Sequence, residues 1–133
     1  MNKDINILIV DDFSTMRRII KKALTSIEFK NFFEATDGLE ALDTLQSKNI
    51  DFLVTDWNMP NMSGLELVKE IRANSRLATI PILMVTAEAK REQIVQAAMA
   101  GVNGYIIKPF SAITLQEKVK QIFKRIEQNN PHQ

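Results

Sequence analysis

The sequence predicts an α/β fold, a parallel sheet built from five strand–helix units and covered by helices on both faces. Short apolar runs rich in β-branched residues alternate five times with segments in which apolar residues recur at helical spacing. No linker, low-complexity stretch or internal repeat interrupts this alternation, and a chain of 133 residues fits one domain. Strands that alternate with helices form parallel sheets with right-handed crossovers, so we expect a single doubly wound domain.

Five apolar runs are predicted to be strands. They comprise residues 5–10, 32–35, 52–55, 81–86 and 104–108. The first run is typical of a strand buried on both faces. Pro81 opens the fourth, at a position where a missing N–H group is tolerated. The second run ends without a polar residue comparable to those that follow the others, which fits an outer strand.

The first three helices have recognisable beginnings. Ser14 is expected to cap the first helix, whose apolar residues recur between positions 16 and 27. Asp37 begins the second helix and is followed three residues later by a glutamate. Ser63 begins the third in the same way, which is the pattern of a capping box.

The last two helices are predicted from their ends and their apolar stripes. The fourth, about a dozen residues long, is expected to stop at Gly101, because glycine favours helix C-termini. The fifth carries apolar residues at helical spacing from Leu115 to Ile126. The polar residues 128–133 are expected to form a frayed tail.

Composition excludes several classes of protein. A net charge of +1 gives no reason to expect a nucleic acid or an anionic membrane as partner. The chain has no cysteine, so disulfides and thiolate metal sites are excluded. No apolar run reaches the length of a membrane span, and Asp11 comes too early for a secretory signal peptide. We therefore expect a cytoplasmic protein without membrane insertion.

Polar side chains follow four of the five predicted strands. Asp11 and Asp12 come after the first, Asp56 after the third, Thr86 ends the fourth and Lys108 ends the fifth. Ligands of open α/β sheets bind at the carboxyl ends of the strands, near the point where the strand order reverses. The fold is therefore expected to bring these five residues, distant in sequence, to one edge of the sheet.

Three carboxylates at one edge repel one another unless a cation compensates them. Lys108 supplies about one positive charge and a divalent metal two, against about three negative charges from Asp11, Asp12 and Asp56. Oxygen ligands favour a hard ion, and Mg²⁺ is the usual one beside phosphate. His132 is the one histidine, so a zinc or iron site is not expected.

Asp56 is the candidate nucleophile, since a carboxylate that attacks phosphorus forms an acyl phosphate. Catalysis would then be mainly positioning and charge neutralisation by the metal and by Lys108. Thr86 could donate its hydroxyl to a phosphoryl oxygen, and Lys108 could bind another as a compact charge. The Lys108–Pro109 bond is hypothesised to be cis, because a cis X–Pro bond makes a sharp turn after a strand.

These residues resemble the signature of bacterial response-regulator receiver domains, over essentially the whole chain. Four longer strings are similar to the chemotaxis members of that family: residues 10–18, 55–61, 84–90 and 104–110. The resemblance implies a flavodoxin-like (βα)5 fold with strand order 2-1-3-4-5 and a receiver domain over residues 1–127. One departure is Glu28, which stands where many relatives have glycine and affects only the local turn.

The resemblance also implies a function and a ligand set. Asp56 would accept a phosphoryl group from a chemotaxis histidine kinase, with no enzymatic activity beyond this transfer and self-dephosphorylation. Mg²⁺ would be bound by Asp11, Asp56 and the backbone carbonyl of Asn58, with Asp12 acting mainly through water. Asn58 and Glu88 would tune the access of hydrolytic water to the phosphoryl group.

A switch and a partner surface are implied in the same way. Thr86 and Tyr105 would form the switch. Independently, a tyrosine on an edge strand can bury its ring while presenting its hydroxyl to water. The partner surface would comprise Ala89, Arg91, Ile94, Tyr105 and Lys118. It would bind the flagellar motor switch protein or a phosphatase, and the protein would be a monomer.

Four other readings remain open at this point. The chain could be a phosphorelay intermediate, or a receiver that only drains phosphate. A phosphohydrolase is disfavoured because such enzymes commonly carry a second Asp two positions after the nucleophile, where this chain has Asn58. A flavin-binding protein is disfavoured because Asp11 and Asp12 occupy the place of a Ser/Thr/Gly-rich phosphate loop.

Overall fold

The computed structural model describes residues 1–129, and its centre is a five-stranded parallel sheet in the order β2-β1-β3-β4-β5. The strands are β1 (Asn6–Val10), β2 (Asn31–Ala35), β3 (Phe52–Thr55), β4 (Ile82–Thr86) and β5 (Gly104–Ile107). Both the α/β class and the strand order are confirmed. The first strand, β1, lies between β2 and β3, and β2 and β5 form the edges of the sheet.

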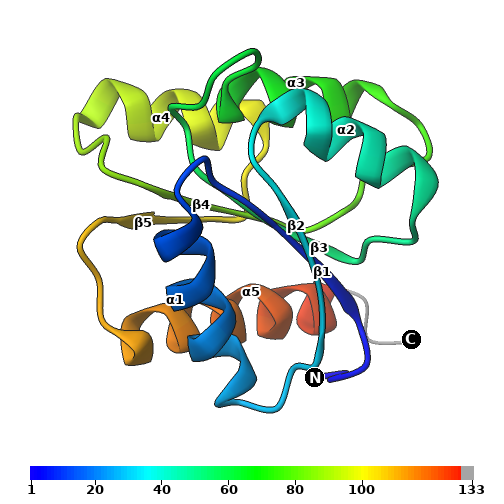
Figure 1. The fold of residues 1–133 in the computed structure, drawn as a ribbon, viewed down its shortest axis with the longest axis vertical. Coiled ribbons are helices and arrows are strands. Elements are labelled where there is room, and N and C mark those ends of the chain that lie inside the picture. The colour runs from blue at the N-terminus through cyan, green and yellow to red at the C-terminus, as the bar shows by residue number, and fades with distance from the viewer. Residues whose placement is uncertain (130–133) are drawn as a thin grey trace.

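Helices cover both faces of this sheet (Figure 1). They are α1 (Ser14–Thr25), α2 (Gly38–Ser47), α3 (Gly64–Ala73), α4 (Arg91–Ala100) and α5 (Ala112–Asn129). Figure 1 shows α1 and α5 on one face and α2, α3 and α4 on the other. None of the helices within residues 1–129 combines the length and the apolar character that crossing a membrane requires.

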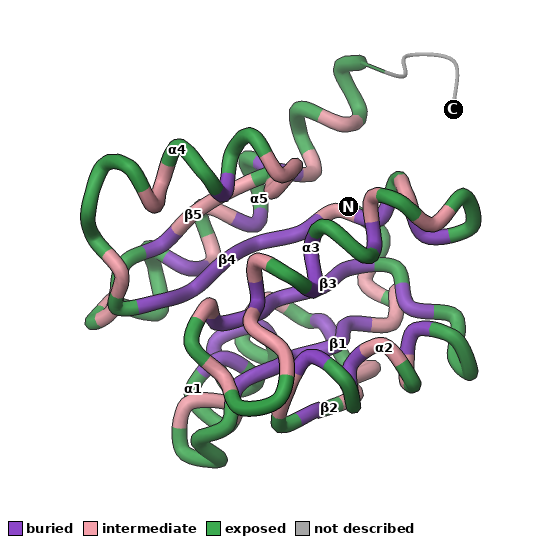
Figure 2. Tube along the Cα trace, turned by 90° about the horizontal axis from the view of Figure 1, so that it is seen from above, coloured by how far each residue is buried: buried purple, intermediate pink, exposed green. Residues whose placement is uncertain are grey.

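The three inner strands separate two hydrophobic cores, because successive side chains of a strand point to opposite faces. In β1, Ile7 and Ile9 pack on the α1–α5 side, while Leu8 and Val10 pack toward α2, α3 and α4. All four are essentially inaccessible to solvent. Strands β3 and β4 are buried along their whole length and β1 from its second residue onward, as the purple segments in Figure 2 show. The strands are thus rigid supports for whatever follows their carboxyl ends.

Most helix boundaries follow the expected signals. Ser63 forms a complete capping box with Glu66, and the Asp37 side chain accepts the backbone N–H of Glu40. Gly101 ends α4 with a φ of 111°, a left-handed conformation that glycine adopts without strain. The expected cap of α1 is wrong, because Phe13 occupies the cap position without a side-chain hydrogen bond and Ser14 is the first helical residue.

Two further boundaries differ from expectation. Helix α1 ends at Thr25, so Ile27 lies in the following turn, where Glu28 has a φ of 79°. Helix α5 continues to Asn129, two residues into the expected tail, because its hydrogen-bonded ladder does not stop where the apolar stripe ends at Ile126. The rest of that predicted tail, residues 130–133, lies outside the described residues.

Candidate functional site

The carboxyl ends of four neighbouring strands bring the predicted residues to one edge of the sheet. Asp11 follows β1, Asp56 follows β3, Thr86 ends β4 and Lys108 follows β5. Backbone bonds extend the strand pairing into these loops: the N–H of Asp56 donates to the carbonyl of Val10 at 3.0 Å, and that of Lys108 to Thr86 at 2.9 Å. The Lys108–Pro109 bond is cis, as hypothesised.

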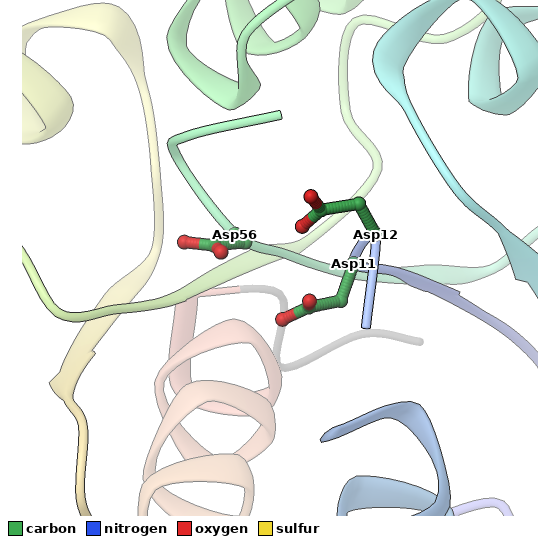
Figure 3. A group of neighbouring side chains, drawn as sticks. All are labelled: Asp11, Asp12 and Asp56. Carbon is green, nitrogen blue, oxygen red and sulfur yellow. The ribbon is translucent and has the colours of Figure 1, made fainter. Parts of the chain in front are cut away.

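Three carboxylates form a compact oxygen-donor cluster. One oxygen from each of Asp11, Asp12 and Asp56 lies within 4.8 Å of the others. Figure 3 shows the three side chains leaving the ends of β1 and β3. Asp11 and Asp56 are buried, whereas Asp12 is exposed. Because all donors are hard oxygens and one is open to water, the cluster fits a divalent ion such as Mg²⁺ that keeps part of its hydration.

Lys108 bridges two of these carboxylates. Its Nζ donates to Asp11 Oδ2 at 2.8 Å and to Asp56 Oδ2 at 3.2 Å. Burial alone would lower the pKa of Lys108, but the hydrogen bond to Asp11 and the charges of Asp56 and Asp11 outweigh it and raise the pKa. Lys108 is therefore a fixed positive charge at neutral pH, placed beside Asp56 Oδ2.

The backbone around Asp56 fixes its carboxylate from the other side. Asp56 Oδ1 accepts the N–H of Trp57 at 2.6 Å, while Gly64 N donates to the Trp57 carbonyl at 2.7 Å. A Cβ atom on Gly64 would lie only 1.9 Å from the Asp56 carbonyl oxygen. Gly64 is thus required for close packing of the β3–α3 loop. Sequence reasoning missed this role, although a glycine just after a helix cap was its available signal.

A pocket of about 450 Å³ opens over Asp56. Asp56, Thr86 and Lys108 line it together with Asn58, Phe13, Thr15, Met16 and Ala87. The side from α1 was not predicted: Phe13, with 66% of its surface exposed, and Met16 supply an apolar wall. A reactant entering this pocket meets charged groups at the base and apolar groups along one side.

Glu88 connects the remaining predicted site residues. Its backbone N–H donates to Thr86 Oγ1 at 3.3 Å, and its carboxylate accepts the side-chain amide of Asn58. The Tyr105 hydroxyl donates to the Glu88 carbonyl at 2.7 Å. This carbonyl, which lies in the loop between β4 and α4, was not predicted from the sequence. Glu88 thus contacts both Thr86 and Tyr105.

The predicted partner surface is only partly assembled into one groove. Ile94, Tyr105 and Lys118 line a groove of about 580 Å³ between α4, β5 and α5. Ala89 and Arg91 are exposed at the start of α4, next to this groove but outside its lining. The Glu88 backbone contacts one lining residue of each hollow: its N–H donates to Thr86 of the pocket over Asp56, and its carbonyl accepts from Tyr105 of the groove.

Comparison with known proteins adds independent information. Residues 7–120 match the family model of the response regulator receiver domain. The chain is 60% identical over 126 residues to chemotaxis protein CheY-3 of Vibrio cholerae, covering 95% of this chain and 97% of that protein. It is 62% identical over 120 residues to CheY of Pseudomonas aeruginosa, with 90% and 97% covered.

One solved structure of similar fold is a complex that contains BeF3 and Mg²⁺. The chain is similar to one chain of the CheX–CheY–BeF3–Mg²⁺ complex from Borrelia burgdorferi, with a TM-score of 0.84 and 26% identity. The match covers 90% of this chain and 89% of that one.

Proposed function

The chain belongs to the response regulator receiver domain family, within it to the CheY-type chemotaxis regulators, and we propose that Asp56 is its phosphoryl acceptor. The observation that carries the proposal is the conjunction at Asp56 itself. This buried carboxylate lies within 4.8 Å of two others, contacts Lys108 and forms the base of an open pocket. A nucleophile, a cation and a site for a second cation thus meet where a reactant can enter.

In the proposed reaction, an Asp56 carboxylate oxygen attacks the phosphorus of a phosphohistidine. A P–O bond forms, the P–N bond breaks, and its electron pair returns to the imidazole of the donor. Lys108 neutralises charge on the transferred group, and the Thr86 hydroxyl donates to one of its oxygens. Water later cleaves the acyl phosphate, releasing inorganic phosphate and restoring Asp56. The chain is thus a signalling regulator and not a conventional enzyme.

Mg²⁺ is the proposed cofactor. Asp11, Asp56 and the Asn58 backbone carbonyl would hold it, with Asp12 acting mainly through water. When bound, the ion supplies two positive charges that stabilise the equatorial phosphoryl oxygens. The donor chemistry of the carboxylate cluster supports this choice, and a similar fold is found in a complex that contains Mg²⁺ and BeF3.

Hydrogen bonds of the Glu88 backbone connect the two residues of the proposed switch, Thr86 and Tyr105. Donation of the Thr86 hydroxyl to the phosphoryl group would shift Thr86 Oγ1 toward that group, and the Glu88 N–H that donates to Oγ1 would shift with it. Displacement of the Glu88 backbone would then remove the carbonyl that holds the Tyr105 hydroxyl. The acceptor pocket would thereby bias the conformation of Tyr105 and of the partner groove. Asn58 and Glu88 would also restrict the access of hydrolytic water.

The proposed partners follow from the chemotaxis-type relatives. We infer that a chemotaxis histidine kinase supplies the phosphoryl group in the cytoplasm. A flagellar motor switch protein or a phosphatase would bind the surface formed by Ala89, Arg91, Ile94, Tyr105 and Lys118. The protein would act as a monomeric receiver domain over residues 1–127. A receiver that relays or drains phosphate without contacting the motor is the alternative.

The acceptor is tested with acetyl phosphate, with and without Mg²⁺, by intact mass and Trp57 fluorescence. We expect one Mg²⁺-dependent phosphoryl adduct on the wild type and none on Asp56→Asn. Asp51→Asn is the matched control, because Asp51 lies just before the same strand at its opposite end and is exposed. An unchanged adduct on Asp56→Asn would refute the proposal.

Motor control requires a separate experiment. The N-terminal peptide of the motor switch protein is immobilised and offered the protein with and without phosphorylation. Retention that increases on phosphorylation supports motor control. Transfer of the label from Asp56 to a histidine phosphotransfer domain, without retention by the peptide, would favour the relay. Rapid loss of phosphate with neither would favour a phosphate-draining receiver.

A further inference from the structure

Arg17 is anchored beside the acceptor site and was not among the predicted site residues. Its Nη1 donates to the backbone carbonyl of Asp11 at 2.7 Å, and its Nε to Glu34 Oε1 at 2.9 Å. The side chain is only 15% exposed, so this is not an ordinary solvated arginine of an outer helix face. One guanidinium therefore joins α1, the end of β1 and the edge strand β2.

The contact lies at a critical peptide bond. The Asp11 carbonyl belongs to the peptide that joins Asp11 to Asp12, so a bond to it restrains the plane from which both carboxylates project. The other groups of Asp11 are also occupied. Its N–H donates to Ala35 O at 3.1 Å, Oδ1 accepts from Phe13 N at 2.9 Å, and Oδ2 accepts from Lys108 at 2.8 Å.

The hydrogen bond from Arg17 acts on a different part of Asp11 from the other contacts. The bonds from Phe13 and Lys108 orient the Asp11 carboxylate directly, but neither reaches Asp12. The exposed Asp12 has its direction set by the preceding peptide, which is the one that Arg17 holds. Groups behind the ligands of a metal fix ligand orientation, and their loss commonly weakens metal binding by about tenfold or more.

We propose that Arg17 is a positioning residue for the divalent-cation site, acting through the Asp11–Asp12 peptide. This inference rests on the proposed function, since it concerns the same cluster of carboxylates. Arg17 holds the two carboxylates at the separation and direction that the cation requires. Glu34 accepts from Nε of the guanidinium, so the edge strand β2 also contributes to the orientation of the site.

The sign of the effect separates this role from simple electrostatics. Arg17 is a cation near a site for another cation, so removal of its charge alone would strengthen Mg²⁺ binding. Loss of orientation would weaken it. A substitution that removes the charge and nevertheless weakens binding therefore reports on positioning.

The experiment measures the Mg²⁺ dissociation constant by Trp57 fluorescence and calorimetry, without any phosphodonor. Arg17→Gln is compared with Arg18→Gln, which removes the same charge from the next, exposed residue. We expect the dissociation constant of Arg17→Gln to rise about tenfold, and that of Arg18→Gln to stay unchanged or to fall. The melting temperature in EDTA is recorded for each variant, because a merely structural role would lower it and leave the dissociation constant unchanged.

Several outcomes would overturn the inference. Equal dissociation constants for wild type and Arg17→Gln would refute the role of Arg17 while leaving the acceptor proposal intact. A wild type that binds no Mg²⁺ would refute both. If Arg17→Gln does not fold, Arg17→Lys is measured against Arg18→Lys, because lysine keeps the charge but lacks the planar group that bonds Asp11 and Glu34 together. A rise in the constant for Arg17→Lys alone supports the inference, and equal constants overturn it.

Discussion

At the scale of single residues, Tyr105 is a titratable group that reports on the proposed switch. Burial, followed by the negative charges of Glu88 and Asp56, raises the pKa of its phenol above the ordinary value. It is the one tyrosine of the chain, so its ionisation can be followed by phenolate absorbance without interference. We predict that Tyr105 titrates above the tyrosine pKa of about 10 found in unfolded peptides.

The sign of the linked effect on stability follows directly. A pKa raised in the folded state means that folding favours the protonated phenol. Its contribution to stability is complete below the unfolded pKa and is lost as pH rises through the folded value. Glu88→Gln should lower the Tyr105 pKa, whereas Asp43→Asn, an exposed carboxylate on α2, should not. A Tyr105 that titrates as a free tyrosine in the wild type contradicts this prediction.

Glu28 is a second residue at which the local conformation carries a cost. Its φ of 79° is left-handed, where a Cβ atom costs about 1–2 kcal/mol. Glycine removes this strain but increases the chain entropy of the unfolded state, so Glu28→Gly should stabilise the protein by about 0.5–1 kcal/mol. Chemical unfolding followed by Trp57 fluorescence measures this gain. Glu28→Ala keeps the Cβ and should give none; an equal gain for alanine would rule out backbone strain as the cause.

At the scale of elements, Arg72 joins the ends of two helices and two strands. From the last turn of α3, it donates to Gly101 O from Nε and Nη2, at 3.0 and 2.7 Å. Further bonds reach the carbonyls of Ala78 and Ile80 and the side chain of Asn103. All four acceptors are neutral oxygens, and burial lowers the pKa of this guanidinium. A single cation thus satisfies carbonyl groups left free by the end of α4 and by the loop before β4.

The position of α4 should therefore depend on Arg72. The helix buries only Ala97, and its cap residue Lys90 makes no side-chain capping bond, so its own packing is weak. We predict that Arg72→Gln lowers the free energy of unfolding by about 2–4 kcal/mol, because several buried carbonyls lose their donor. Hydrogen exchange should accelerate near Gly101 more than in α2.

Arg76 offers a matched control for that prediction. Its Nη2 also donates to backbone carbonyls, those of Leu45 and Gln46 at 3.0 and 3.3 Å, but the residue is exposed. Arg76→Gln should cost about 0.5 kcal/mol or less. Equal losses from the two substitutions would show that the burial of Arg72, and its link to α4, are not what makes it important.

At the scale of the whole molecule, the features predicted from sequence are those set by strand and helix periodicity. The apolar runs placed all five strands, and the polar residues at their ends placed Asp11, Asp56, Thr86 and Lys108 at one edge. This works because a parallel sheet brings the ends of its strands together irrespective of the rest of the chain. Ser63 was equally recognisable as a helix cap, because its capping-box partner Glu66 is only three residues away.

The features missed are those that depend on contacts between elements. Arg17 is indistinguishable in sequence from the exposed Arg18, and Arg72 resembles any arginine at a helix end. Only the packed structure shows which of them meets backbone carbonyls. The acceptor of the Tyr105 hydroxyl was missed for the same reason, because it is a loop carbonyl 17 residues away. Periodicity predicts which face of a helix or strand is buried, but it does not predict which residue of another element a side chain contacts.

The carboxylate cluster links the proposed site to the stability of the whole protein. Three carboxylates face one lysine, so the cluster without Mg²⁺ contains uncompensated repulsion. We predict that Asp12→Asn, at the exposed member, stabilises the protein in EDTA by about 0.5–1 kcal/mol. With Mg²⁺ at a hundred times its dissociation constant, the wild type should gain about 2.7 kcal/mol, and the variant should gain less because it binds the ion more weakly.

The order of stability between wild type and Asp12→Asn should therefore reverse when Mg²⁺ is added. Thermal unfolding in EDTA and across a Mg²⁺ titration measures both halves of this prediction. Asp43→Asn removes a distant exposed carboxylate and should change neither the stability in EDTA nor the gain with Mg²⁺. If the wild type is already more stable than Asp12→Asn in EDTA, Asp12 makes favourable contacts without the ion, and the prediction is wrong. A reversal requires the Asp12 carboxylate to destabilise the folded protein without the ion and to stabilise it when the ion is bound.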